Sequence, residues 1–189
     1  MVTVLDKQTA LVLIDLQKGV VNLPLAHPVE NVISNAVKLT NAFHKAGLPV
    51  VIVNVDSTNA AWTKTRKDAK PVNRSMSEDW TQIIPQIQQQ LGDILITKHT
   101  WGAFHETGLH HTLQQRHITG IVLAGIATSI GVESTARQAS ELAYNIAFAQ
   151  DAMTDMFAEA HEKSVQYIFP RIGELDHTDA IIEKLQGRE

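Results

Sequence analysis

Five short apolar runs alternate with helical patterns along the whole chain. Each run is bounded by polar or turn residues, as buried parallel strands are. The runs cover residues 10–14, 50–55, 94–97, 121–124 and 146–149. This alternation predicts an α/β fold with three αβα layers, in which a doubly wound, mainly parallel sheet lies between helices.

Signals at the ends of the helical patterns locate several helices. One helix is predicted over 31–46, because a glycine and a proline follow its last apolar repeat. Thr107 and Thr178 are each predicted to cap a later helix. Glu133 and Arg137 are four residues apart, which is the spacing of an ion pair on one helix face.

The length and charge of the chain restrict its class. A chain of 189 residues with 44% hydrophobic content can bury the core of one domain but is short for two, so one domain over 1–189 is predicted. The net charge is −4 and the basic residues are scattered, which argues against a nucleic-acid partner. No apolar run is long enough for a signal sequence or a membrane span. The chain has no cysteine, so a cytoplasmic location without disulfides is expected.

The segment 121–137 passes from a buried strand through small residues directly into a helix. A strand that feeds a helix N-terminus directs unpaired backbone N–H groups toward one point, with the positive end of the helix dipole behind them. The apolar spacing places the start of this helix at about Gly131. The turn is therefore predicted to bind an oxyanion or a carboxylate.

Polar residues also follow the other predicted strands, at the edge where open α/β sheets bind ligands. They are Asp15, Asp56, Lys98 and Asp151. Any strand meets polar residues where it leaves the core, and this explanation suffices for Asp56 and Asp151. Asp15 lies between two apolar residues, where desolvation favours its protonated form, whereas Lys98 would favour the carboxylate. A proton donor under two opposed influences can operate near neutral pH.

Three motifs in this order resemble those of the isochorismatase-like hydrolases, also called the cysteine hydrolase superfamily. Asp15 with Gln17 matches the first-strand motif, and Lys98 with the aromatic-rich turn after it matches the lysine motif. The third motif is matched by Gly125, Thr128, Val132, Thr135 and Ala136. The resemblance implies the αβα fold of the family, Asp15 as the catalytic acid or base and Lys98 as the catalytic lysine.

Gly131 stands where this family has its nucleophilic cysteine, so thiol chemistry is excluded. True isochorismatases also pair an aspartate and a lysine with a glycine. That resemblance implies hydrolysis of a vinyl ether, with Asp15 protonating the enolpyruvyl methylene carbon, Lys98 binding or polarising the substrate, and water capturing the oxocarbenium ion. Gly131 would leave room for substrate or water, although a tight turn alone would also favour a glycine.

The resemblance further implies a cis peptide bond between Ile126 and Ala127. Such a bond would direct backbone donors at the substrate. The predicted site at this turn comprises Ala127, Thr128 and Gly131.

The irregular segment from 56 to about 80 is polar and long enough to expect a functional role. Trp62, Arg66 and Arg74 in this segment, together with Trp101, are candidate contacts for the ring and carboxylate groups of a substrate. A small carboxylate-bearing molecule is therefore the expected substrate.

No metal and no cofactor are predicted. Nicotinamidases bind metal through an Asp-x-His motif, and the corresponding residues 56–58 lack the histidine. His105, Glu106 and His110 resemble a zincin signature, but one extra residue rotates the second histidine off the face of the first.

Two other functions were compatible with the sequence. Ser129 lies in an approximate nucleophile elbow and is followed by Asp151 and then by His161 or His177, as in a serine hydrolase. The chain could also be a catalytically silent relative that binds a small carboxylate.

Self-association is also expected, as a homodimer or a higher even homo-oligomer. The segment 151–157 is predicted to be a loop, which would expose Met153, Met156 and Phe157 in a monomer. Related proteins of the family assemble in this way.

Overall fold

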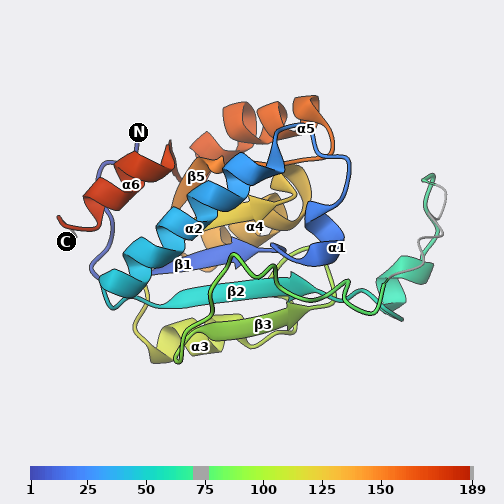
Figure 1. Ribbon diagram of the computed structural model, residues 1–189, viewed down its shortest axis with the longest axis horizontal. Coiled ribbons are helices and arrows are strands. Elements are labelled where there is room, and N and C mark those ends of the chain that lie inside the picture. Colours follow the sequence, from blue (N-terminus) through green and yellow to red (C-terminus); the bar gives the residue numbers. More distant parts are fainter. Residues whose placement is uncertain (70–76, 188–189) are drawn as a thin grey trace.

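The computed structural model describes residues 1–69 and 77–187 (Figure 1). Six strands form one sheet in the order β3-β2-β1-β4-β5-β6, and every neighbouring pair is parallel. The strands are β1 (Thr9–Ile14), β2 (Val50–Val55), β3 (Ile94–Lys98), β4 (Gly120–Ile126), β5 (Asn145–Thr154) and β6 (Glu174–Asp176). The chain therefore crosses over from β3 to β4, past β2 and β1, as a doubly wound sheet requires.

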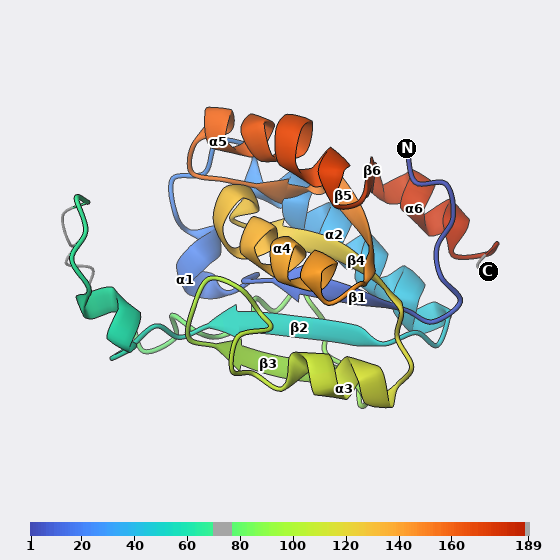
Figure 2. The same ribbon diagram turned by 180° about the vertical axis from the view of Figure 1, so that it is seen from behind.

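Helices cover both faces of this sheet. They are α1 (Lys18–Val21), α2 (Val29–Lys45), α3 (Leu109–Gln115), α4 (Glu133–Glu141), α5 (Ala158–Lys163) and α6 (Thr178–Lys184). In Figure 1, α2 and α6 lie in front of the sheet, and Figure 2 shows α3 and α4 on the opposite face. The three αβα layers confirm the predicted fold class. No helix within the two described ranges is long and apolar enough to cross a bilayer.

The central strand β1 separates two hydrophobic cores. Successive side chains of a strand point to opposite faces. Leu11 and Leu13 accordingly join the core under α2, whereas Ala10, Val12 and Ile14 join the core under α4. All six residues of β1 are buried, because both faces are covered.

The two predicted helix caps differ from the observed ones. The oxygen Oγ1 of Thr107 accepts a hydrogen bond from the Leu109 N–H at 3.3 Å, but Gly108, with φ +72°, occupies the cap position. Thr178 is the first residue of α6 and not its cap. Its N–H and its hydroxyl both donate to Asp151 Oδ1 at 2.8 Å, so a carboxylate from β5 satisfies this helix end.

Strand β5 extends beyond its predicted end because it contains a bulge. Phe148 pairs with Leu123 of β4, and Met153 then pairs with Gly125, so β5 has additional residues between these two points. Met153 is buried in β5, and the prediction that 151–157 is a loop was wrong for its first four residues. Phe157 remains 66% exposed. Self-association stays a prediction.

Candidate active site

Asp15 and Lys98 form a buried ion pair at the carboxyl edge of the sheet. Asp15 directly follows β1, and Lys98 is the last residue of β3, so the lysine side chain reaches across the end of β2. Lys98 Nζ lies 2.7 Å from Asp15 Oδ2. The exposed fractions of the two residues are 5% for Asp15 and 1% for Lys98. The same ammonium donates to the Thr100 carbonyl at 3.3 Å.

The surroundings of Asp15 make its carboxyl group easier to protonate than a carboxyl group in water. Burial raises its pKa from 3.8 to about 6, although the charge and the hydrogen bond of Lys98 act in the opposite direction. Its second oxygen, Oδ1, is buried and has no hydrogen-bond partner among the described residues. A proton on Oδ1 would therefore be free of any partner in the described part of the chain while Oδ2 remains held by Lys98.

The turn after β4 covers this pair. The peptide bond between Ile126 and Ala127 is cis, in agreement with the expectation from the sequence. Residues Thr128–Val132 form a π-helical turn that leads into α4. The Ile130 and Val132 N–H groups both donate to the Ala127 carbonyl at 3.1 Å, which fixes the turn as one compact unit.

Gly131 lies directly against Asp15. A Cβ atom at Gly131 would lie 2.9 Å from Ile14 Cγ2 and 3.2 Å from Asp15 Oδ2. The structure thus brings Asp15, Lys98 and Gly131 together, as the motifs predicted. The space that a thiol would need beside Asp15 is limited by Ile14.

We expect Gly131→Ala to lower the free energy of unfolding by about 1–3 kcal/mol, because the added methyl overpacks against Ile14. In an Ile14→Ala background most of this loss should disappear, since the contacting methyl group is gone. Urea unfolding of the two single variants and the double variant measures the coupling. Gly187→Ala, where an added Cβ would meet nothing within 4 Å, serves as the control. Gly131→Ala variants that are as stable as the wild type would contradict the steric limit.

The predicted substrate contacts are only partly brought together. The Trp62 and Trp101 rings meet edge to face with centroids 6.0 Å apart, and Trp62 Nε1 donates to the His99 carbonyl at 2.7 Å. Both rings line a pocket that also includes Thr100, Gly102, Ser134 and Gln138, and the carbonyl of Thr100 accepts a hydrogen bond from Lys98. Arg66 is exposed and does not line this pocket. Figure 1 shows its segment projecting beyond the carboxyl end of β2. Arg74 lies outside the described residues.

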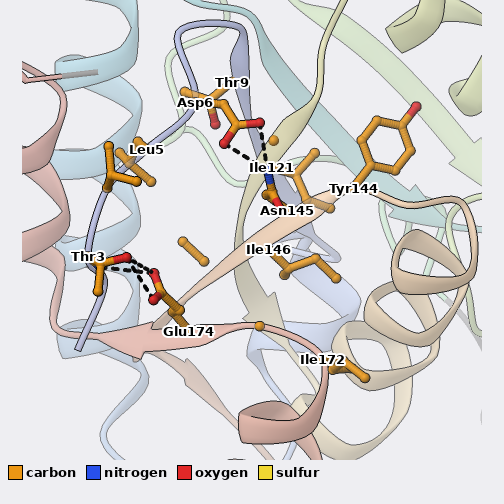
Figure 3. A pocket seen from close by; sticks show the side chains of 14 residues that line it. Thr3, Leu5, Asp6, Thr9, Ile121, Tyr144, Asn145, Ile146, Ile172 and Glu174 are labelled. Carbon is orange, nitrogen blue, oxygen red and sulfur yellow. Dashed lines mark hydrogen bonds between the residues drawn. The ribbon is translucent and has the colours of Figure 1, made fainter. Parts of the chain in front are cut away.

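A different pocket, of about 350 Å³, lies at the amino ends of β1, β4 and β5 (Figure 3). There Thr3 Oγ1 donates to Glu174 at 2.8 Å, and Asn145 Nδ2 donates to Asp6 at 3.0 Å. These contacts join the N-terminal segment to β5 and β6. Because ligands of such sheets bind at the carboxyl ends of the strands, this pocket is not the candidate active site.

The serine hydrolase arrangement is not assembled in the described structure. His161 Nδ1 lies 2.8 Å from the hydroxyl of Thr128, and Asp151 binds the start of α6. His177 lies 3.7 Å from Asp151, but neither histidine is hydrogen-bonded to Ser129 within the described residues. The backbone N–H of Ser129 donates instead to Asp155 Oδ2 at 2.7 Å.

Asp155 was missed by the sequence analysis. It is 1% exposed, and its carboxylate accepts hydrogen bonds from the Ser129 N–H and, at 2.8 Å, from its own neighbour Met156. Asp155 directly follows the end of β5, which is the position where site residues were sought on the other strands. The predicted strand ended at residue 149 because the bulge was not recognised, so Asp155 was not considered.

The residues considered for metal binding have other contacts. His110 Nδ1 lies 2.9 Å from the Tyr144 hydroxyl, and Asp56 accepts a hydrogen bond from the Thr58 N–H at 3.0 Å. Within residues 1–69 and 77–187, no three histidine or acidic side chains are grouped so that they could hold a metal ion. Glu133 and Arg137 form the expected helical ion pair, at 2.8 Å.

Comparison with known proteins identifies the class of hydrolase that this α/β fold represents. It belongs to the isochorismatase family, whose domain model matches residues 9–180. An uncharacterized isochorismatase family protein of Bacillus subtilis, YwoC, is 42% identical over 183 residues, which cover 95% of each chain. A solved isochorismatase family protein from Burkholderia thailandensis superposes with a TM-score of 0.92 and 36% identity, covering 98% of this chain and 100% of that one.

An enzyme of known reaction is among the structural relatives. N-carbamoylsarcosine amidase from Thermoplasma acidophilum shares 25% identity at a TM-score of 0.74, over 91% of this chain and 97% of that one. The chain is therefore an isochorismatase-like hydrolase.

Proposed function

We propose that this hydrolase cleaves a small carboxylate-bearing vinyl ether, with Asp15 as the general acid and without a covalent intermediate on residue 131. One observation carries the proposal: a buried carboxyl group with a raised pKa and one free oxygen lies against a glycine in the nucleophile position. A buried acid of this kind can hold a proton near neutral pH and release it to a substrate.

The reaction would proceed in two stages, in which Asp15 first gives up a proton and then regains one. Asp15 transfers its proton to the terminal methylene carbon of the enolpyruvyl group, and an oxocarbenium ion forms at the adjacent carbon. Water then adds to that carbon and returns a proton to Asp15. The resulting hemiketal collapses to pyruvate and an alcohol, so no bond to the protein forms at any point.

Lys98 would have two roles in this scheme. Its ammonium holds Asp15 Oδ2, which leaves Oδ1 as the oxygen that carries the proton. Its positive charge would also attract the substrate carboxylate. The Trp62 and Trp101 rings, which line a pocket together with Thr100, are the proposed contacts for the apolar part of the substrate. Backbone groups of Ala127, Thr128 and Gly131 would complete the site.

The rate should depend on pH through Asp15. Because its folded pKa is about 6, the acid form is lost as pH rises through that value. We expect kcat/KM to decline above about pH 6, with a limiting slope of roughly tenfold per pH unit. A pH–rate profile of pyruvate release measures this decline. A rate that instead rises through pH 6 would mean that Asp15 acts as a base.

The same pKa also predicts a dependence of stability on pH that needs no substrate. Between pH 3.8 and about 6, Asp15 is more fully protonated in the folded state than in the unfolded state, so its contribution to the free energy of unfolding should fall as pH rises across this window. Urea unfolding at the two ends of the window measures the slope. Asp15→Asn should remove this contribution to it.

The function itself is tested by assaying pyruvate release and ammonia release in parallel. The substrates are isochorismate, nicotinamide and carbamoyl amino acids, each also tested for binding by calorimetry. Pyruvate release from the enol ether alone would support the proposal, and ammonia release would contradict it. Binding without turnover of any substrate would favour a catalytically silent binding protein.

A further inference from the structure

A histidine of α5, His161, contacts the turn that follows β4 and includes Ala127, Thr128 and Gly131. His161 Nδ1 lies 2.8 Å from Thr128 Oγ1, and the same hydroxyl lies 3.0 Å from the Thr154 carbonyl. A carbonyl can only accept, so the Thr128 hydroxyl donates its proton to Thr154. The hydrogen bond with His161 must then run the other way, with the Nδ1–H group of the ring as the donor.

Thr128 occupies a position from which it can set the geometry of the turn. It follows the cis peptide bond by one residue and begins the π-helical turn that contains Gly131. Its side chain is completely buried, and its hydroxyl is bound on both sides. The Ala127 carbonyl, one residue earlier, accepts from Ile130 and Val132. A shift of Thr128 would therefore move the backbone groups beside Asp15.

His161 is itself kept in place by its neighbours. The ring of His27 meets it edge to face at a centroid distance of 4.7 Å, and His27 Nδ1 lies 2.9 Å from the Thr154 hydroxyl. Burial and the nearby His27 lower the pKa of His161, against the opposite effect of Asp155 and Glu162. A neutral ring that donates through Nδ1 is consistent with both observations.

We propose that His161 is a positioning residue for the active site and acts through Thr128. It holds the turn that carries Ala127 and Gly131 in the geometry that faces Asp15. The catalytic consequence of this role rests on the proposed function, whereas the structural consequence does not.

The test compares two replacements of His161. His161→Asn keeps an N–H donor close to the position of Nδ1. His161→Leu removes the donor and replaces the ring by an apolar side chain of similar size. In the leucine variant we expect hydrogen-exchange protection of the Ile130 and Val132 amides to fall roughly 3- to 10-fold, the range expected for one lost hydrogen bond. The asparagine variant should retain most of the protection. With an active substrate, kcat should fall on the order of tenfold in the leucine variant while KM changes little.

A double-mutant cycle with Thr128→Val separates a positioning role from general destabilisation. In the Thr128→Val background, His161→Leu should cause no further loss of protection, because its partner is already absent. His177→Leu, an exposed histidine beside Asp151, is the matched control and should leave both amides unchanged.

Additive effects in the cycle, or equal losses in the asparagine and leucine variants, would overturn the proposal. Protection that stays unchanged in His161→Leu would do so as well. Because hydrogen exchange needs no substrate, the expected protection pattern in a protein without turnover would uphold the role of His161 while the proposed function failed.

Discussion

Asp15→Asn should reduce turnover by about 10²- to 10⁴-fold, the usual loss when a general acid is removed. Asparagine keeps the volume of the side chain but cannot transfer the proton. It also tolerates the local backbone, since Asp15 has φ +52° and asparagine adopts this region more readily than most residues. The measurement is the steady-state rate on the best substrate, with the fold of the variant checked by circular dichroism.

This replacement needs two controls, because it leaves the buried Lys98 without a counter-charge. Asp79→Asn removes a carboxylate from an ion pair of similar length, 2.9 Å to Lys18, at a half-exposed position and should leave the rate nearly normal. Asp15→Asn combined with Lys98→Met removes both buried charges and should be folded but inactive. Near-normal turnover of Asp15→Asn would contradict the proposed acid.

Gly125→Ala should destabilise the fold severely, by on the order of 3 kcal/mol or more, because it combines backbone strain with a clash. Gly125 has φ +123°, and a Cβ atom there would lie 2.1 Å from the Ile14 carbonyl oxygen. That oxygen belongs to the buried central strand β1, which has neighbours on both sides. Neither backbone can move away without disrupting the sheet next to Asp15.

Gly47→Ala provides the matched comparison. Gly47 also has a positive φ, +66°, but an added Cβ would meet nothing within 4 Å. Its replacement should cost only about 1–2 kcal/mol, the strain of a left-handed residue. Urea unfolding of both variants compares the two losses. Equal losses would mean that the approach of β4 to Ile14 adds nothing to the effect.

Local patterns in the sequence located the main strands well but not their full extent. The run at 121–124 and its neighbours were recognisable because strands buried on both faces are continuously apolar. The bulge in β5 was not recognisable, since the residues between Phe148 and Met153 are out of register with β4, and Asp151 among them is held by the distant start of α6. Short elements such as α1 and β6 contain too few residues for a periodic signal.

The same distinction applies to the site. Asp15, Lys98 and Gly131 could be predicted as site residues because each lies in a motif that follows a predicted strand. The contacts that hold this turn in place could not be predicted. Asp155 and His161 reach the turn only because β5 is longer than predicted and α5 then brings the chain back beside residues 128 and 129. Arg66 is a residue type suited to binding a carboxylate, but the direction of its side chain depends on how a long irregular segment leaves the sheet.

The position of Lys98 on β3 has a consequence for how this enzyme would lose activity on heating. β3 is an edge strand that pairs only with β2 in the described part of the sheet, and Leu95 and Thr97 on it face solvent. Edge strands open locally at a lower free-energy cost than central ones. Fraying of β3 would withdraw the ammonium from Asp15 while β1, β4 and both cores remain intact. Thermal inactivation should then precede global melting, and the working temperature range of the enzyme would be set by the stability of one peripheral strand.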